Sequence, residues 1–168
     1  MCPLGGNFVS LDYAQGAEVI SAAFEAGIGY FDTAPWYGFG RSKRLVGDQI
    51  RDRPHVLSTK VGRILKAGAV EDPNQFGMVD PLSFYPIYGY SYGGIMRAYE
   101  DSLQRLGLDR IYFLLVHDIG AFQHGEQNER HFKDLKSSGY KAMTELRASG
   151  DVTAIGRSVY IARANAPR

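Results

Sequence analysis

Two patterns of apolar residues alternate along the chain. Helical spacing, with apolar positions three or four residues apart, alternates with short apolar runs typical of strands that are covered on both faces. The predicted helices span residues 12–26, 42–51, 91–106 and 132–148, and the predicted strands span residues 28–32, 55–59, 111–116 and 152–155. This order indicates an α/β fold with a parallel sheet and with helices outside it.

Residues 61–90 fit neither pattern. They contain Pro73, Pro81 and Pro86 together with several glycines, and we therefore predict a long loop. A loop of this length inside a compact domain is usually functional or disordered. Its last part is aromatic, with the run FYPIYGY at residues 84–90, and such side chains either line a pocket or cover an edge of the core.

Composition and charge exclude several classes of protein. The 168 residues are 45% hydrophobic and 22% charged, which is typical of a globular chain with one core. A formal net charge of +1 gives no electrostatic case for a nucleic-acid partner or a membrane surface. The densest basic stretch, residues 41–44, is short, and we interpret it as the solvated start of a helix.

The chain carries one cysteine, Cys2, which excludes an internal disulfide and suits a reducing compartment. No apolar run approaches 18 residues, and the N-terminus lacks a basic segment followed by an apolar one. We therefore expect no membrane span, no secretory signal and a cytoplasmic location. No metal site is predicted.

Three of the predicted strands carry an ionisable residue at their carboxyl end: Asp32 is the last residue of its strand, and Lys60 and His117 directly follow theirs. Each has an ordinary interpretation by itself, as a turn or capping residue, a solvated lysine and a satisfied core histidine respectively. In parallel α/β folds, however, the carboxyl ends of the strands open on one face, where the functional site is built. Because all three residues lie at the same end of their strands, we predict that they belong to one site.

These residue types support acid–base chemistry on an oxygen atom. Asp32 and Lys60 come from neighbouring strands and could pair, and Tyr37 follows Asp32 closely. A cationic Lys60 beside Tyr37 would favour the phenolate and lower the tyrosine pKa. Tyr37 could then donate a proton to a carbonyl or accept one from an alcohol, and His117 could hydrogen-bond the same substrate oxygen.

Four sequence blocks carry a family resemblance. They are YFDTAPWYG at residues 30–38, STKVGR at 58–63, DSLQRLGLDRI at 101–111 and LVHD at 115–118. In wording, order and spacing these blocks resemble the aldo-keto reductase superfamily over most of residues 3–156. The STKVGR and LVHD blocks are most similar to the bacterial branch of D-threo-aldose 1-dehydrogenase, L-fucose dehydrogenase and pyridoxal 4-dehydrogenase.

The resemblance implies a (β/α)8 TIM barrel that transfers hydride between NADP or NAD and a small-molecule aldehyde, sugar or alcohol. It places the family's catalytic tetrad on Asp32, Tyr37, Lys60 and His117. Tyr37 would be the general acid–base, Lys60 would tune it, Asp32 would hold Lys60, and His117 would position the substrate oxygen. Asp32 and Lys60 would also contribute to the cofactor site, and Trp36, Tyr37 and His117 to the substrate site. The choice between NAD and NADP, and the substrate itself, stay open.

The chain departs from that family in length, since a closed barrel of this kind needs about 250 residues. We therefore expect a partial barrel and an N-terminal fragment, with about the first four to five βα units and an incomplete first strand over residues 1–156. Residues 157–168 are expected to form an atypical tail. The family's cofactor contacts come largely from later strands, so we expect weak or absent activity. Open sheet edges could favour self-association.

Two other functions stay open from the residues. The chain could be a non-catalytic fragment or interaction module that retains half of the barrel. It could also be another barrel enzyme that uses Lys60 for a Schiff base. The candidate partners Asp32 and Tyr37 suit a charged lysine, however, whereas a Schiff base needs a neutral one.

Overall fold

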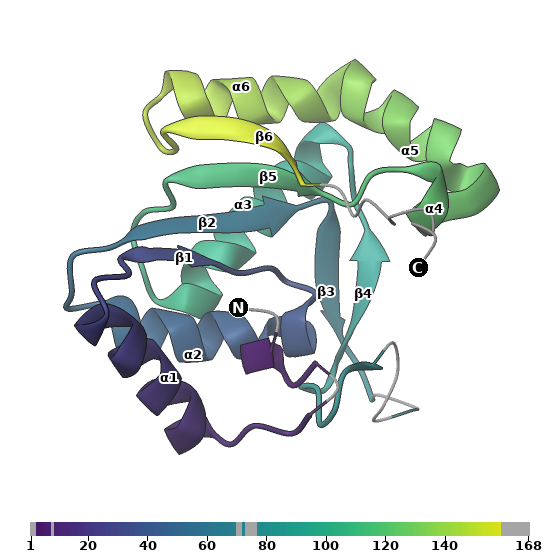
Figure 1. Ribbon diagram of the computed structural model, residues 1–168. Coiled ribbons are helices and arrows are strands. Elements are labelled where there is room, and N and C mark those ends of the chain that lie inside the picture. Colours follow the sequence, from purple (N-terminus) through teal and green to yellow (C-terminus); the bar gives the residue numbers. More distant parts are fainter. Residues whose placement is uncertain (1–2, 8, 70–71, 73–76, 159–168) are drawn as a thin grey trace, which may run out of the picture.

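A four-stranded parallel sheet forms the centre of the molecule. The computed structural model describes residues 3–7, 9–69, 72 and 77–158. The strands are β1 (Tyr30–Asp32), β2 (Val56–Val61), β5 (Phe113–His117) and β6 (Ala154–Ser158), side by side in that order (Figure 1). The predicted α/β fold with a parallel sheet is confirmed.

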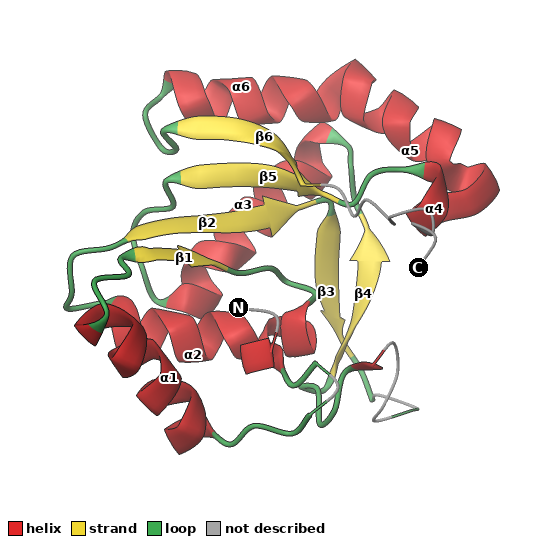
Figure 2. Cartoon of the chain, viewed as in Figure 1, coloured by secondary structure: helices red, strands yellow, loops and turns green. Residues whose placement is uncertain are grey.

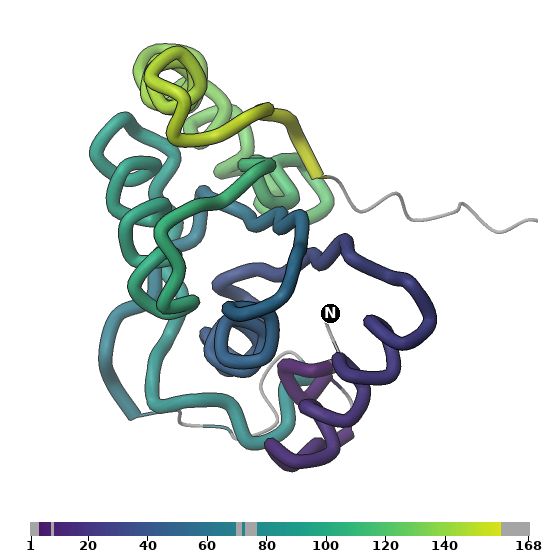
Figure 3. Tube along the Cα trace, turned by 90° about the vertical axis from the view of Figure 1, so that its left-hand side faces the viewer, coloured from purple at the N-terminus to yellow at the C-terminus, as the bar shows by residue number. Residues whose placement is uncertain are grey.

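Helices cover one face of this sheet. The longer ones are α1 (Tyr13–Glu25), α2 (Arg41–Ile50), α3 (Tyr92–Leu106) and α6 (Tyr140–Ala148). In the view along the strands, α2, α3 and α6 follow one another on the same side of the sheet (Figure 3). Each helix in the series α1, α2, α3, α6 contacts the next, as in the outer wall of a barrel.

Local sequence sets where these helices begin and end. The Asp12 side chain accepts a hydrogen bond from the backbone N–H of Gln15, whose side chain accepts one from the Asp12 backbone. The Ser91 hydroxyl likewise accepts from the N–H of Gly94 at the start of α3. Gly107 ends α3 with a φ of 61°, which glycine adopts without strain. These caps satisfy backbone groups that a helix end leaves unpaired.

Alternation along the strands separates an apolar face from a polar one. Phe31, Leu57 and Leu114 are completely buried in the main core between the sheet and the helices. The intervening positions point to the opposite face of the sheet because successive side chains of a strand alternate. That face carries Asp32, Ser58, Lys60 and His117 near the carboxyl ends of the strands.

Residues 61–90 contain regular structure, so the prediction of one long loop is wrong. Strands β3 (Arg63–Ala67) and β4 (Phe84–Tyr88) form an antiparallel hairpin that stands across the carboxyl ends of the parallel strands (Figure 2). Ile64 and Leu65 of the hairpin are buried. Pro86 is tolerated in β4 because a two-stranded hairpin leaves half of its backbone groups outside the ladder.

The C-terminal part differs from the expected boundaries. The helix expected at residues 132–148 starts earlier, since α4 (Ala121–His124) and α5 (Asn128–Asp134) precede it and a π-helical turn, Leu135–Gly139, joins α5 to α6. Strand β6 reaches Ser158, so the tail expected from residue 157 begins inside a strand. The rest of that tail, residues 159–168, lies outside the described residues, as does Cys2.

The N-terminal segment and the basic stretch also differ from expectation. Pro3–Gly5, at the position of the expected incomplete first strand, is a 3₁₀ helix. Lys43 is completely buried, so the interpretation of residues 41–44 as solvated is wrong for this residue. Its ammonium donates to Ser102 Oγ because the face of α2 that carries Lys43 packs against α3. No helix in the described part of the chain is long and apolar enough to cross a membrane.

Candidate active site

The structure brings the ionisable residues at the strand ends together. Asp32 ends β1, Lys60 lies one residue before the end of β2, and His117 ends β5. In the register of these adjacent strands, Asp32 pairs with Ser58 and Lys60 pairs with Leu115. The three side chains therefore lie along one edge of the sheet, where parallel strands place their carboxyl ends.

Asp32 and Lys60 form an ion pair. The Lys60 ammonium lies 2.5 Å from Asp32 Oδ2 and donates to the carbonyl oxygen of Thr33 at 3.1 Å. Asp32 Oδ1 accepts a hydrogen bond from Ser58 Oγ, which accepts one from the Tyr30 hydroxyl at 2.9 Å. Because Lys60 is almost completely buried, its charge needs these partners.

A tight turn brings Tyr37 over this pair. Gly38 follows with a φ of 61°, and a Cβ atom there would lie 2.2 Å from the carbonyl oxygen of Gly5, so the turn requires glycine. The Lys60 ammonium lies 5.0 Å from the centroid of the Tyr37 ring. The His117 ring stands at 89° to the Tyr37 ring, with the two centroids 5.9 Å apart.

The surroundings of His117 keep its imidazole neutral. Burial, followed by the positive charges of Arg63, Lys60 and Lys43, lowers the pKa of His117 from 6.5 to about 2. Its Nδ1 atom is buried and has no hydrogen-bond partner among the described residues. A neutral imidazole carries a single N–H, which suits a hydrogen-bond donor to a substrate oxygen.

Arg63 and Asp118 extend the site beyond the predicted residues. Arg63 is buried, and its guanidinium lies 4.3 Å from the centroid of the Trp36 ring and 3.5 Å from Asp118 Oδ2. The same carboxylate oxygen lies 3.3 Å from Nε2 of His117. Arg63 is the last residue of the STKVGR block and Asp118 the last of the LVHD block. Membership in these blocks is the sequence signal that could have identified both residues. The placement of Arg63 depends on the turn from β2 into β3, and that of Asp118 on the left-handed residue after β5; the local pattern predicts neither.

Tyrosines of the hairpin and of the segment after it flank the site. The Tyr90 hydroxyl donates to the carbonyl oxygen of His117 at 3.2 Å and lies 2.9 Å from Nε2 of His124. The Tyr90 ring packs on Gly62, where φ is 96° and a Cβ atom would lie 2.3 Å from the ring. The Tyr88 ring lies against His124, with centroids 4.4 Å apart. Tyr90 is buried against the end of β5, whereas Tyr88 is 42% exposed.

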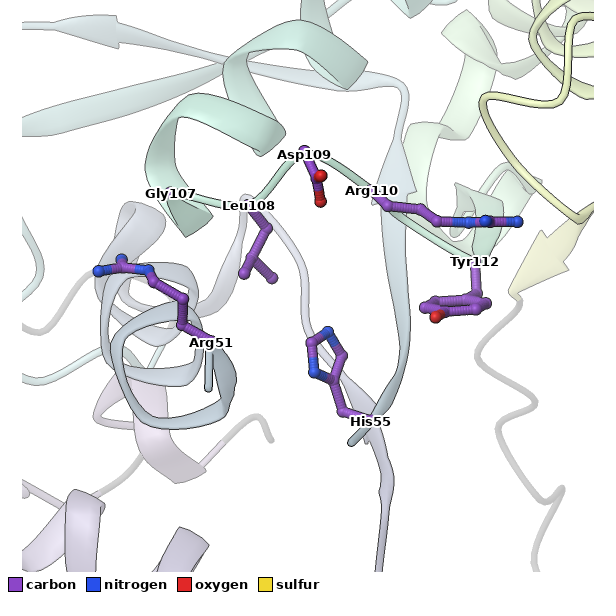
Figure 4. A pocket seen from close by; sticks show the side chains of 7 residues that line it. All are labelled: Arg51, His55, Gly107, Leu108, Asp109, Arg110 and Tyr112. Carbon is purple, nitrogen blue, oxygen red and sulfur yellow. The ribbon is translucent and has the colours of Figure 1, made fainter. Parts of the chain in front are cut away.

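A pocket of about 390 Å³ lies at the opposite end of the sheet (Figure 4). Its lining residues come from segments that precede β2 and β5: Arg51, His55, Gly107, Leu108, Asp109, Arg110 and Tyr112. Reacting groups of parallel α/β barrels gather at the carboxyl ends of the strands, so this pocket stands apart from the candidate active site. Within the described ranges, no group of three or more His, Cys, Asp or Glu could hold a metal ion.

The geometry is suited to one class of chemistry. A tyrosine above a lysine–aspartate ion pair, beside a neutral histidine, can move a proton to or from a carbonyl or hydroxyl oxygen. The ion pair with Asp32 occupies the Lys60 nitrogen and so argues against a Schiff base. Together with the parallel sheet, these features are those expected at the strand ends of a parallel α/β barrel.

Comparison with known proteins gives the family. A family model described as the aldo/keto reductase family matches residues 3–164, and the chain belongs to that family. The chain is 40% identical over 169 residues to pyridoxal 4-dehydrogenase of Microbacterium luteolum, covering 94% of this chain and 49% of that protein. It is 36% identical over 163 residues to D-threo-aldose 1-dehydrogenase of a Pseudomonas species, covering 91% of this chain and 46% of that protein.

A solved structure agrees on the fold. Glycerol dehydrogenase from Gluconobacter oxydans matches with a TM-score of 0.65 and 24% identity, covering 94% of this chain and 42% of that protein. The expected family, the branch and the partial-barrel fold are therefore confirmed. The chain spans about half the length of the curated relatives it matches. The division at residue 156 stays a prediction.

Proposed function

We propose that the chain carries the acid–base half of an NAD(P)-dependent oxidoreductase. Its reaction interconverts an alcohol or sugar lactol with the corresponding carbonyl compound or lactone. One arrangement carries the proposal: Lys60 lies 2.5 Å from Asp32 and 5.0 Å from the centroid of Tyr37, whose ring meets that of His117 at 89°. These contacts match the roles that the family resemblance implies for the four residues.

Each residue has one task in this proposal. In the reducing direction the Tyr37 hydroxyl gives its proton to the substrate oxygen as the carbonyl carbon accepts hydride. Lys60 stabilises the phenolate that remains, and Asp32 holds Lys60 in place. His117 donates its N–H to the same oxygen, and Trp36 lines the substrate side. In the oxidising direction Tyr37 takes the proton from the alcohol.

The residues present fit a nicotinamide cofactor on the polar face of the sheet. The Asp32 side chain is 34% exposed and Tyr30 is 51% exposed, so this face is accessible beside the Lys60 ammonium. Asp32 and Lys60 would line the cofactor site. A bound nicotinamide would supply or accept the hydride. Either NADP or NAD is compatible with these residues.

The substrate is a small aldehyde, sugar or alcohol in this proposal. Two relatives support that class, since one is a pyridoxal dehydrogenase and the other an aldose dehydrogenase. Trp36 and Tyr88 flank Arg63 on the substrate side and would pack against a ring or a carbon chain. A cytoplasmic location is part of the same proposal.

We further propose that activity is weak when this chain acts alone. The described residues that face the site supply acid–base groups but few groups for a dinucleotide, and positioning of the hydride donor is essential for transfer. The alternative is a non-catalytic interaction module, which the sheet favours because β1 and β6 form its two edges. Cofactor-dependent turnover separates these two functions.

Replacement of Tyr37 by Phe tests the proposal, because it removes the hydroxyl and keeps the ring. We expect aldehyde- or sugar-dependent turnover of NAD or NADP to fall by at least about 100-fold, which is the usual contribution of a general acid. Tyr140, which is 56% exposed on α6, offers a matched control, and Tyr140→Phe should keep wild-type turnover. Turnover that survives Tyr37→Phe would show that the tetrad is wrongly assigned.

A further inference from the structure

The backbone of Asp118 adopts an unusual conformation directly after His117. Its φ of 42° lies in the left-handed region, where Asp is found more often than most residues other than glycine. The Asp118 N–H donates to the carbonyl oxygen of Ser158 at 2.8 Å, which joins this residue to the end of the neighbouring strand β6. In this conformation the Asp118 carboxylate oxygen Oδ2 lies 3.3 Å from Nε2 of His117.

Arg63 holds the same carboxylate from the other side. Its side chain is 1% exposed, and a guanidinium buried to that extent needs a partner for its charge. The described partners are two aromatic rings, Trp36 at 4.3 Å and Tyr88 at 5.9 Å from the guanidinium, and one carboxylate oxygen, Asp118 Oδ2, 3.5 Å away. Oδ2 is therefore the atom shared by Arg63 and His117.

The two nitrogens of His117 have opposite surroundings. Nδ1 is buried without a partner among the described residues, whereas Nε2 faces a carboxylate. A proton on Nδ1 would leave a buried donor unsatisfied, and a proton on Nε2 would meet an acceptor. The neutral imidazole therefore belongs in the form that carries its hydrogen on Nε2.

We propose that Arg63 and Asp118 are positioning residues, with Arg63 holding the Asp118 carboxylate beside His117 so that the imidazole hydrogen stays on Nε2. This inference deepens the proposed function, because it concerns the donor that would meet the substrate oxygen. The single N–H is then held on Nε2, beside the Asp118 carboxylate, before a substrate arrives. In this proposal Asp118 and Arg63 set the tautomer of the His117 imidazole, and neither residue belongs to the tetrad.

The charges around His117 come from several elements. Arg63 belongs to β3, Lys60 to β2 and Lys43 to α2, and all three oppose protonation of the ring. Asp118 follows β5 and is the carboxylate beside Nε2. The His117 ring is therefore neutral and carries one hydrogen, and the quantity to measure is which of its two nitrogens carries it.

Long-range ¹H–¹⁵N correlation spectra of the labelled chain measure that tautomer directly, without cofactor or substrate. The wild-type spectrum should show His117 with its hydrogen on Nε2 near neutral pH. In Asp118→Ala the ratio of Nε2–H to Nδ1–H forms should fall several-fold. Arg63→Gln should lower the ratio as well, and Arg63→Lys, which keeps the positive charge, should lower it less.

Arg110→Gln serves as the control. Arg110 lies over Tyr112 at the opposite end of the sheet, and its replacement should leave the His117 signals unchanged. A hydrogen on Nδ1 of the wild-type ring would overturn the proposal, even if no variant folds. An unchanged ratio in a folded Asp118→Ala would also overturn it, and equal ratios in the Arg63 variants would remove the part assigned to Arg63. Absence of cofactor-dependent turnover in a wild-type chain whose His117 hydrogen lies on Nε2 would contradict the proposed function alone.

Discussion

At the scale of single residues, burial decides the charge of His117 and so links the candidate site to stability. The pKa of its ring is about 2 in the folded chain, compared with an ordinary value of 6.5. Below pH 6.5 the unfolded chain therefore binds a proton that the folded chain does not. The stabilisation from this group is fully present above pH 6.5 and is lost as the pH falls towards 2.

Acidification should consequently destabilise the chain through His117. We expect its share to reach about 1.4 kcal/mol per pH unit between the two pKa values, measured by urea unfolding at a series of pH values. His117→Asn removes the titrating group, so its free energy of unfolding should depend less steeply on pH. Parallel pH curves for the two proteins would contradict a buried, neutral His117.

Lys43 is a second buried ionisable residue, and the proposed reaction does not use it. Burial, with smaller effects of Arg105 and Lys60, holds the pKa of Lys43 well below its ordinary value of 10.5. Folding at neutral pH must therefore remove a proton from Lys43 or bury its charge, and both oppose folding. The opposition disappears as the pH rises towards 10.5, because the unfolded chain then loses the same proton.

Replacement of Lys43 by Met should therefore stabilise the chain. We expect the free energy of unfolding at neutral pH to rise by about 1–3 kcal/mol, with a smaller gain at higher pH. Ser102 keeps a partner in the variant because its hydroxyl also donates to the carbonyl oxygen of Ala98. Lys66 is exposed, so Lys66→Met should change stability little. A Lys43→Met chain that unfolds at lower urea concentration than the wild type would contradict this view.

At the scale of secondary structure, the contact between α2 and α3 depends on one glycine. A Cβ atom at Gly47 would lie 1.9 Å from the carbonyl oxygen of Leu106, which belongs to the backbone and cannot turn aside. Gly47→Ala should therefore separate the two helices and lower the free energy of unfolding by about 3 kcal/mol, as measured by urea unfolding. At Gly93 in α3 no neighbouring atom lies within 4 Å of the position that a Cβ atom would take. Gly93→Ala should therefore raise the free energy of unfolding by about 0.5 kcal/mol. Equal effects of both substitutions would contradict the close packing.

The elements differ in how far the sequence predicts them. Local signals suffice for α1 and α3, because Asp12, Ser91 and Gly107 cap these helices as their residue types predict. The parallel strands follow from their continuous apolar runs. The β3–β4 hairpin does not follow, because its pairs, such as Arg63 with Tyr88, join residues far apart in sequence around prolines. Long-range pairing outweighs local propensity there.

The candidate site divides in the same way. Asp32, Lys60 and His117 are predictable because strand ends of a parallel sheet converge, and Tyr37 because it follows Asp32 closely in sequence, as the family resemblance also implies. Arg63 and Asp118 are not, because their contacts depend on the hairpin and on a left-handed turn after β5. Lys43 is misread because a basic stretch at a helix start does not reveal which of its residues faces a neighbouring helix.

At the scale of the whole molecule, the described sheet is open. Strands β1 and β6 form its edges, and Tyr30 on the polar face is 51% exposed. Unpaired strand edges favour association with another chain. We expect the purified chain to associate with itself as its concentration rises, which sedimentation velocity measures.

A charge on the exposed face of the sheet should weaken this association. Tyr30→Glu places a carboxylate there, whereas Tyr140→Glu places one on the outer side of α6, where Tyr140 is 56% exposed. The first variant should sediment more as a monomer, and the second should behave like the wild type. A wild-type chain that stays monomeric at every concentration would exclude self-association through these edges.

Cofactor binding tests the central proposal, an oxidoreductase site on this chain, most directly. Trp36 is the single tryptophan of the chain and lies 4.3 Å from the Arg63 guanidinium, so its fluorescence reports on the site. Titration of the folded chain with NAD and with NADP should change that fluorescence in a weak but saturable way for at least one of them. The absence of a saturable change with either cofactor would contradict the proposed function of this chain.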